Sequence, residues 1–369
     1  MIYLDYQATT PLAVEARDAM LPWLDKFGNP HSPHQLGREA GAAIEVATTQ
    51  IAVALGDKKG LGRVILTSGA TEAANWALQG AVAGKRRKIV TIATEHACVL
   101  DTAEWLAQRN VELMVLPVLA NGLVDLDAAA SAIDERTALV ATMLVNNEIG
   151  VIQPIAELAQ MARRAGAHFF CDAVQGFGRV DLPLNECDLV AISAHKIHGP
   201  KGIGALWLRD GLDWPAMIHG GGQQQGLRSG TLSPMLAAGF GAAATLADQR
   251  CEQDRIHIIN LSDLADKLFE DWTLNGDPVR RYDGNRNLRR DGVDASRLIS
   301  EVRNIAFSAG SACASGSGRP SHVLRALGLS EAQARGSIRL GFGRYTTQEE
   351  LREAAALINQ AVARQLEWA

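Results

Sequence analysis

Lys196 is the residue in this sequence around which the most demanding chemistry can be arranged. Apolar residues run up to Ile192, and a hydroxyl, an imidazole and the Lys196 amine then precede a stretch rich in glycine. This pattern indicates a buried strand that ends in a polar turn. A lysine in such a place is partly desolvated, which lowers its pKa and frees the amine to form Schiff bases with carbonyl groups. For this stretch alone, a surface lysine in a glycine-rich loop is the alternative interpretation.

Other polar side chains supply the remaining parts that a pyridoxal phosphate site requires. Such a site needs a lysine, an anion near the pyridine nitrogen, donors for the phosphate and a cover for the ring. Asp172, after the predicted strand 168–171, is the candidate anion, although it could instead cap a helix. His96 could stack on the ring, or could simply begin a helix. The expected phosphate donors are Thr71, Ser193 and His195, and the expected contacts of the ring hydroxyl are Asn147 and Gln175.

The turn at residues 68–71 has the composition of a phosphate site. The strand predicted at 63–67 runs through small residues into a helix. Free backbone N–H groups at a helix N-terminus suit a phosphate. An ordinary helix cap by Ser68 or Thr71 is the alternative.

Two further residues suggest a nucleophile and a substrate contact. Cys313 lies among serine, alanine and glycine residues, so its thiol is expected to be accessible and reactive. Arg339 falls in a β-patterned stretch and could hold a substrate carboxylate through two hydrogen bonds, unless it is one more surface arginine. His195 and His198 have H-x-x-H spacing, but no third ligand follows at a usual interval, so we expect no metal site.

Alternating strands and helices must position these groups. Between residues 63 and 208 the pattern predicts an α/β fold, with a mostly parallel sheet covered by helices. The polar groups follow the strand ends, which is where ligands bind in open α/β sheets. From about residue 260 the pattern changes to a smaller α+β region. We therefore expect a large domain of residues 13–259 and a small domain of 1–12 and 260–369, which carries Cys313.

Composition narrows the protein class. A length of 369 residues allows two cores, and a net charge of −5 argues against nucleic-acid binding. No apolar run is long enough to span a bilayer, and Asp5 interrupts any export leader. The five cysteines are odd in number and show no C-x-x-C spacing, which fits the reducing cytoplasm.

Ten ordered motifs extend over nearly the whole chain. They are YLDYQATTP (3–11), FGNP (27–30), TSGATE (67–72), TEH (94–96), VNNEIG (145–150), DAVQ (172–175), HKIHGPKG (195–202), RSGT (228–231), GSAC (310–313) and SIR (337–339). In this respect the chain resembles the cysteine desulfurases of the NifS/IscS type, in the class V branch of fold-type I pyridoxal phosphate enzymes. Such a set is far more specific than any single motif.

The resemblance implies a role for each matching residue. Lys196 would hold pyridoxal phosphate and move the Cα proton, and Asp172 would pair with the pyridine nitrogen. His96 would stack on the ring and belong to the catalytic set. Cys313 would attack the sulfur of L-cysteine, giving alanine and a cysteine persulfide. The implied phosphate contacts are Ala70, Thr71, Ser193, His195 and, from the other subunit of a homodimer, Thr231; the ring-oxygen contacts are Asn147 and Gln175; the substrate-carboxylate contacts are Asn29, Asn147 and Arg339.

Two departures and two alternatives accompany this resemblance. Residues 284–292 are polar where the family has an apolar strand, and this sequence ends at Ala369 without the C-terminal extension of the IscS branch, which favours the NifS branch.

A selenocysteine lyase on the same fold is one alternative. A non-catalytic persulfide carrier or assembly partner is the other, although the retention of Lys196, Asp172 and Cys313 together argues against it. The expected partners are L-cysteine, a second copy of the chain and a sulfur acceptor such as an iron–sulfur scaffold.

Overall fold

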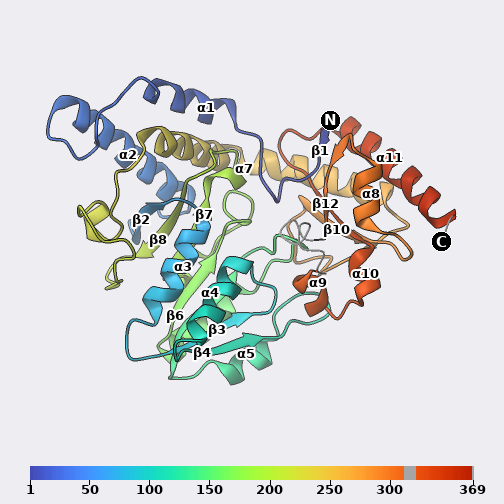
Figure 1. Cartoon of the computed structure of the whole chain (residues 1–369), viewed down its shortest axis with the longest axis horizontal. Helices are drawn as coiled ribbons and strands as arrows, with labels where there is room; N and C mark the ends of the chain where they lie inside the picture. Colours follow the sequence, from blue (N-terminus) through green and yellow to red (C-terminus); the bar gives the residue numbers. More distant parts are fainter. Residues whose placement is uncertain (311–320, 368–369) are drawn as a thin grey trace.

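A seven-stranded sheet forms the centre of the computed structural model, which describes residues 1–310 and 321–367 (Figure 1). In spatial order its strands are β2 (Gly62–Thr67), β8 (Gly204–Arg209), β7 (Leu189–Ser193), β6 (His168–Asp172), β5 (Thr137–Met143), β3 (Lys88–Ile92) and β4 (Glu112–Leu116). β8 runs antiparallel to its neighbours β2 and β7, and the pairs from β7 to β4 are parallel. The predicted mostly parallel sheet is therefore confirmed.

Helices cover both faces of this sheet. In β6, Phe169 packs with the helices on one face and its neighbour Phe170 with those on the other, because successive strand residues point to opposite sides. The first face carries α2 (Gln35–Ala54), α5 (Leu126–Ala132), α6 (Ile155–Ala165) and the first half of α7 (Pro234–Leu268), and the second face carries α3 (Ala70–Ala81) and α4 (Ala97–Ala107). Burial on two sides explains why β3 and β5 have no exposed residue.

A smaller α+β region adjoins the distal half of α7. Within the described ranges its antiparallel sheet has the order β12 (Ser308–Ala309), β13 (Ser337–Gly341), β10 (Asn285–Arg289) and β9 (Thr273–Leu274). Its helices are α8 (Ala295–Glu301), α9 (His322–Ala326), α10 (Glu331–Arg335) and α11 (Gln348–Glu367). The smaller α+β region predicted from about residue 260 is therefore confirmed, although its strands β9, β10 and β12 were not predicted; the domain boundaries at 12 and 259 stay a prediction.

An N-terminal arm connects the two parts. β1 (Ile2–Tyr3) pairs in parallel with β11 (Ile305–Ala306), and Asp5 bridges to Gly341 of β13. Farther along, the Thr10 N–H donates to the carbonyl of His195 at 3.0 Å. A short helix, α1 (Val14–Met20), then packs on α7. Residues 1–12 therefore extend from the small sheet to the turn that carries Lys196.

The polar stretch at 284–292 forms the interior strand β10. Asn287 has no exposed surface, and Asn285 and Arg286 are also buried. Burial is tolerated because these side chains have partners: Asn287 donates to the Glu148 carbonyl at 3.1 Å, and Arg286 pairs with Asp266 at 2.9 Å. Hydrogen bonds and an ion pair thus stabilise this interior strand in place of apolar packing.

None of the helices in the described part of the chain is long and apolar enough to cross a membrane.

Candidate active site

A cavity of about 530 Å³ opens beyond the carboxyl ends of β5, β6 and β7. It brings together ten of the predicted site residues, from six separate segments of the chain. They are Ala70, Thr71, His96, Asn147, Asp172, Gln175, Ser193, His195, Lys196 and Arg339. The position agrees with the expectation that ligands of an open α/β sheet bind at the strand ends.

Lys196 lies in the turn after β7, and the N-terminal arm contacts its amine. The Nζ donates to the carbonyl of Gln7 at 2.5 Å and to the carbonyl of Ala8 at 2.8 Å. These acceptors hold the amine at the cavity wall. In the sequence, residues 3–11 stand out only as a family motif, which gives no sign that these two carbonyls contact Lys196.

Asp172 ends β6 and combines the two roles considered for it. Its carboxylate accepts the Val174 N–H at 3.0 Å, as a cap would, and it also lines the cavity. Burial raises the pKa of Asp172, while the Val174 N–H and the positive charges of His96 and Lys196 lower it. A cationic ring nitrogen in the cavity would stabilise the ionised carboxylate further, which fits the pyridine partner of pyridoxal phosphate.

The two imidazoles in the cavity have different partners. His96 caps α4 by accepting the Cys98 N–H at 3.2 Å, so it begins a helix and lines the cavity as well. His195 shares a hydrogen bond of 3.1 Å with the Thr9 hydroxyl. Burial, followed by the charges of Lys196 and Lys201, lowers the pKa of His195 to about 4, so this imidazole is neutral at pH 7.

The start of α3 forms the rim expected to hold a phosphate. Ala70 and Thr71 occupy its first turn, where backbone N–H groups have no partner within the helix. Glu72 accepts the Ser68 N–H at 2.8 Å and pairs with Arg228 at 2.8 Å, which fixes Arg228 against this turn. Ser193 and His195 approach from the end of β7, so donors from two elements line one side of the cavity.

Arg339 lies in the cavity wall on the side of the small sheet. Pairing of β13 with β12 and β10 places it between Ser308 and Asn287. Only 1% of Arg339 is exposed, and its Nε has no hydrogen-bond partner among the described residues. A buried N–H without a partner is uncommon in native proteins. A carboxylate in the cavity would supply the missing acceptor.

Four predicted site residues differ from the others in their partners or in their position. Gln175 lines the cavity, but its amide already donates to Gln7 and accepts from Arg179, at 2.8 and 2.6 Å. Asn29 and Thr231 are exposed and do not line this cavity. Cys313 lies outside the described residues.

No three His, Cys, Asp or Glu side chains in residues 1–310 and 321–367 come together as metal ligands would. His198, the second histidine of the H-x-x-H spacing, contacts the Pro11 carbonyl at 2.9 Å through Nδ1. His198 therefore contacts the backbone of the N-terminal arm.

Glu148 is a buried acid close to Arg339 and leads to a prediction on pH. Burial raises its pKa to about 7, although Ser321, which donates to its carboxylate, and the charge of Arg339 both lower it. Between pH 4.5 and 7 the folded state therefore holds a proton that the unfolded state releases, so stability falls as the pH rises through this window. Glu148→Gln removes this titration. We expect the melting temperature of the variant, relative to wild type, to rise between pH 5 and pH 8.

Thermal unfolding at the two pH values measures this difference. Glu349→Gln, on the exposed start of α11, is the control and should show no such trend. A Glu148→Gln difference that is the same at pH 5 and pH 8 would mean that Glu148 does not titrate in this range.

Comparison with known proteins identifies the family. The family model described as aminotransferase class-V matches residues 2–353. The chain belongs to the class-V aminotransferases. It is 45% identical to the cysteine desulfurase IscS of Rickettsia bellii, over 97% of this chain and 90% of that one. The predicted resemblance to cysteine desulfurases is thereby confirmed.

Solved structures of similar proteins agree with this class-V aminotransferase fold. A NifS-like protein superimposes with a TM-score of 0.90 at 29% identity, covering 98% of this chain and 99% of that one. SspA in complex with cysteine gives a TM-score of 0.84 at 32% identity, covering 94% of this chain and all of that one (100%). The curated relatives carry the IscS name and similar structures the NifS name, so the NifS branch stays a prediction.

Proposed function

We propose that the cavity around Lys196 is where this chain binds pyridoxal phosphate and L-cysteine. The protein is a cysteine desulfurase and depends on pyridoxal phosphate, in keeping with its family and its relatives. One observation carries the assignment of the site. A lysine amine, the buried carboxyl group of Asp172 and the Nε of Arg339, which has no hydrogen-bond partner within residues 1–310 and 321–367, belong to a single cavity. These three groups match an aldehyde, a pyridine nitrogen and an amino-acid carboxylate.

The residues present fit the cofactor. Lys196 would bind it covalently, Asp172 would lie at the ring nitrogen, and His96 would cover the ring. The start of α3, with Ala70 and Thr71, would receive the phosphate together with Ser193 and His195, and Asn147 and Gln175 would contact the ring oxygen. The cofactor supplies an electron sink for charge that develops at the substrate Cα.

The protein's own side chains would then act one after another. Arg339 and Asn147 bind the substrate carboxylate and orient the Cα–H bond toward Lys196. The Lys196 amine takes that proton, and the Gln7 and Ala8 carbonyls keep the amine in place. The thiolate of Cys313 attacks the substrate sulfur, so a sulfur–sulfur bond forms as the Cβ–sulfur bond breaks. A proton added at Cβ gives alanine, and Cys313 keeps the extra sulfur.

A product assay tests this function. Purified protein loaded with pyridoxal phosphate should convert L-cysteine into alanine, and each alanine should be matched by one sulfide when a thiol reductant is present. L-selenocysteine, tested in parallel, distinguishes a selenocysteine lyase, which would act only on the selenium compound. The absence of alanine from loaded protein would refute the proposed activity and favour a persulfide carrier.

The sulfur would pass to an acceptor protein, for which an iron–sulfur scaffold is the leading candidate because the curated relatives bear the IscS name. A cytoplasmic location fits the cysteines of the described part of the chain, Cys98, Cys171, Cys187 and Cys251, which are all free thiols.

A homodimer would explain the two predicted residues that do not line the cavity. Asn29 and Thr231 are both exposed in the single chain. This exposure is expected of residues that contribute to the site of a neighbouring subunit. Large apolar side chains are exposed in the same stretch of the sequence, residues 12–36: Leu12, Val14, Leu21, Leu24, Phe27 and Leu36. Phe27 alone is 87% exposed. Exposed apolar side chains in such number are common where proteins bind one another.

We therefore expect the double variant Leu24→Asp/Phe27→Asp to shift the protein from dimer to monomer in sedimentation experiments. Charged groups cannot be buried there without a large desolvation cost. Val279→Asp, at an apolar residue that is 84% exposed in the small region, is the control and should stay dimeric. Wild-type protein that is active as a monomer at the assay concentration would contradict the homodimer.

A further inference from the structure

Asp5 of the N-terminal arm contacts the arginine expected to hold the substrate carboxylate. Its Oδ1 accepts from Arg339 Nη2 at 2.7 Å and from the Ser308 hydroxyl at 2.9 Å. Asp5 and Arg339 are 334 positions apart in the sequence. The backbone bridge between Asp5 and Gly341 brings them together, because it sets the arm beside β13.

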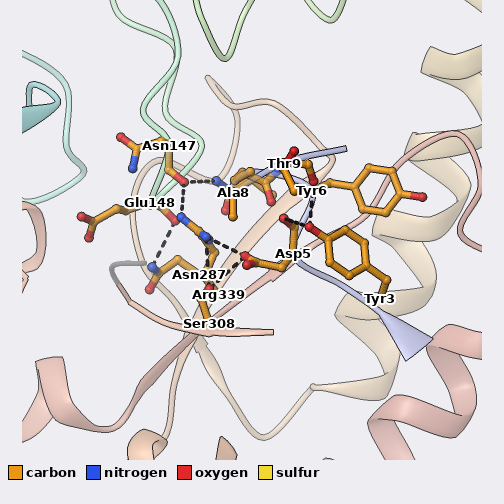
Figure 2. Close-up of polar contacts among 12 residues, drawn as sticks. Tyr3, Asp5, Tyr6, Ala8, Thr9, Asn147, Glu148, Asn287, Ser308 and Arg339 are labelled. Atoms are coloured by element: carbon orange, nitrogen blue, oxygen red, sulfur yellow. Dashed lines mark hydrogen bonds and ion pairs between the residues drawn. The ribbon is translucent and has the colours of Figure 1, made fainter. Parts of the chain in front are cut away.

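Two more acceptors complete the surroundings of the guanidinium (Figure 2). Arg339 Nη1 donates to the Asn147 carbonyl at 3.1 Å, and Nη2 lies 3.3 Å from the Ser308 hydroxyl. The acceptors therefore come from three places: the arm, the turn after β5 and strand β12. Together they fix the plane of the guanidinium, and in the part of the chain that the structure describes its Nε has no hydrogen-bond partner.

We propose that Asp5 is a positioning residue that holds Arg339 in the orientation needed to receive the carboxylate of the substrate. This inference rests on the proposed function, in which Arg339 binds that carboxylate. Asp5 itself would not touch the substrate. Its effect would reach the reaction through the geometry of Arg339.

Burial makes this arrangement necessary. Arg339 is 1% exposed, and an isolated buried charge is costly unless it is paired and hydrogen-bonded. The Asp5 carboxylate supplies that pairing before the substrate arrives. A guanidinium already fixed in its bound orientation loses little conformational freedom when the ligand binds, which favours affinity.

The charge of Asp5 has a second, opposite effect. A carboxylate beside Arg339 weakens the attraction of the same guanidinium for another carboxylate. Substitutions of Asp5 can therefore separate its effect on the orientation of Arg339 from the effect of its charge. Asp5→Asn keeps an oxygen that can accept both hydrogen bonds and loses only the charge, whereas Asp5→Ala loses both.

The arm also has the rigidity that a positioning residue requires. The Tyr3 hydroxyl lies 3.1 Å from the Asp5 carbonyl and 2.9 Å from the Thr9 carbonyl, and so spans the segment between them. The Ala8 N–H donates to the Asp5 carbonyl at 2.9 Å, which closes a turn. Asp5 therefore has a fixed backbone position from which its carboxylate reaches Arg339.

Binding of two small amines to the holoenzyme tests the proposal. L-Alanine carries a carboxylate and ethylamine does not, and the dissociation constant of each follows from the change in cofactor absorbance. Asp5→Ala should raise the dissociation constant for L-alanine about tenfold, the effect of losing one charge-assisted hydrogen bond, and that for ethylamine by less than about twofold. Asp5→Asn should stay within about threefold of wild type for both ligands.

Two further variants make the outcome decisive. Arg339→Gln should raise the L-alanine constant by about a hundredfold; if it leaves the preference for L-alanine unchanged, the proposed carboxylate site itself is wrong. If Arg339→Gln acts as expected but Asp5→Ala changes the L-alanine constant by less than twofold, the role of Asp5 is overturned. If Asp5→Ala does not fold, Ser308→Ala tests the role of Asp5 in its place. Its dissociation constant for L-alanine should rise about threefold, and that for ethylamine should not change.

A control separates positioning from stability. Asp266 pairs with Arg286, another buried arginine of the small sheet, at 2.9 Å, and neither residue lines the cavity. Asp266→Asn should lower the melting temperature without changing the affinity for L-alanine. An equal loss of L-alanine affinity in Asp266→Asn and Asp5→Ala would show that the small region as a whole, and not Asp5, sets the binding.

Discussion

Lys196→Ala is expected to abolish turnover of L-cysteine and to leave pyridoxal phosphate attached only by noncovalent contacts. The amine is the group proposed both to bind the cofactor and to move the Cα proton, so a single substitution removes two functions. Loss of general acid–base catalysis alone lowers rates by about 10²- to 10⁴-fold. The rate of alanine formation measures the first effect. Release of the cofactor during dialysis, followed by its absorbance, measures the second.

Two controls accompany this variant. Lys267→Ala, at an exposed position near the end of α7, should keep both the cofactor and the activity. Thermal unfolding should show that Lys196→Ala remains folded, because Lys196 lies in the turn after β7 and not in the core of the sheet. Alanine production at the wild-type rate by Lys196→Ala would exclude the proposed role of this lysine.

Cys313→Ala is expected to keep the cofactor and to bind L-cysteine, yet to release almost no sulfur. The other cysteines are poor substitutes. Burial raises the pKa of Cys98, which lines the cavity, and that of Cys171, and nucleophilic attack requires the thiolate. Burial also raises the pKa of Cys251, despite its exposure. We therefore expect Cys313 to be the acceptor of the substrate sulfur.

Mass spectrometry after treatment with L-cysteine provides the measurement. An additional mass of one sulfur should appear on the peptide that contains Cys313, and it should be absent from the peptides of the other four cysteines. Cys251→Ala, an exposed site, serves as the control and should retain the modification and the activity. Sulfur on another cysteine, together with an active Cys313→Ala variant, would rule out this transfer.

The fold was predictable because its strongest signals are local. The fully buried β3 and β5 appear as short apolar runs, and the helices between them carry the apolar spacing of one covered face. Asp172 and Lys196 could be proposed as site residues because each follows such a run. The rule that ligands bind at strand ends then placed them together without any knowledge of tertiary contacts.

What the sequence could not reveal depends on contacts between distant segments. The carbonyls of Gln7 and Ala8 contact Lys196, but every residue has a carbonyl, so side-chain identity gives no signal. The pairing of Asp5 with Arg339 joins opposite ends of the chain. β10 lacked the apolar pattern of an interior strand because its buried side chains are satisfied by hydrogen bonds to other segments, such as that from Asn287 to Glu148.

The pairing of the first strand with residues near the other end of the chain also constrains when the protein can mature during synthesis. Ribosomes add about 5 to 20 residues per second, so roughly 20 to 70 s separate the appearance of Asp5 from that of Arg339, 334 positions later. For most of that interval β1 has no β11 to join, and until its end the arm has no β13 beside it. The sheet that leads to Lys196 can form in the meantime, but the arm whose carbonyls contact its amine then lacks the support of the small sheet. A nascent chain that stops short of residue 337 should therefore contain a folded large sheet with an incomplete lysine site, and capture of the cofactor should follow release of the chain.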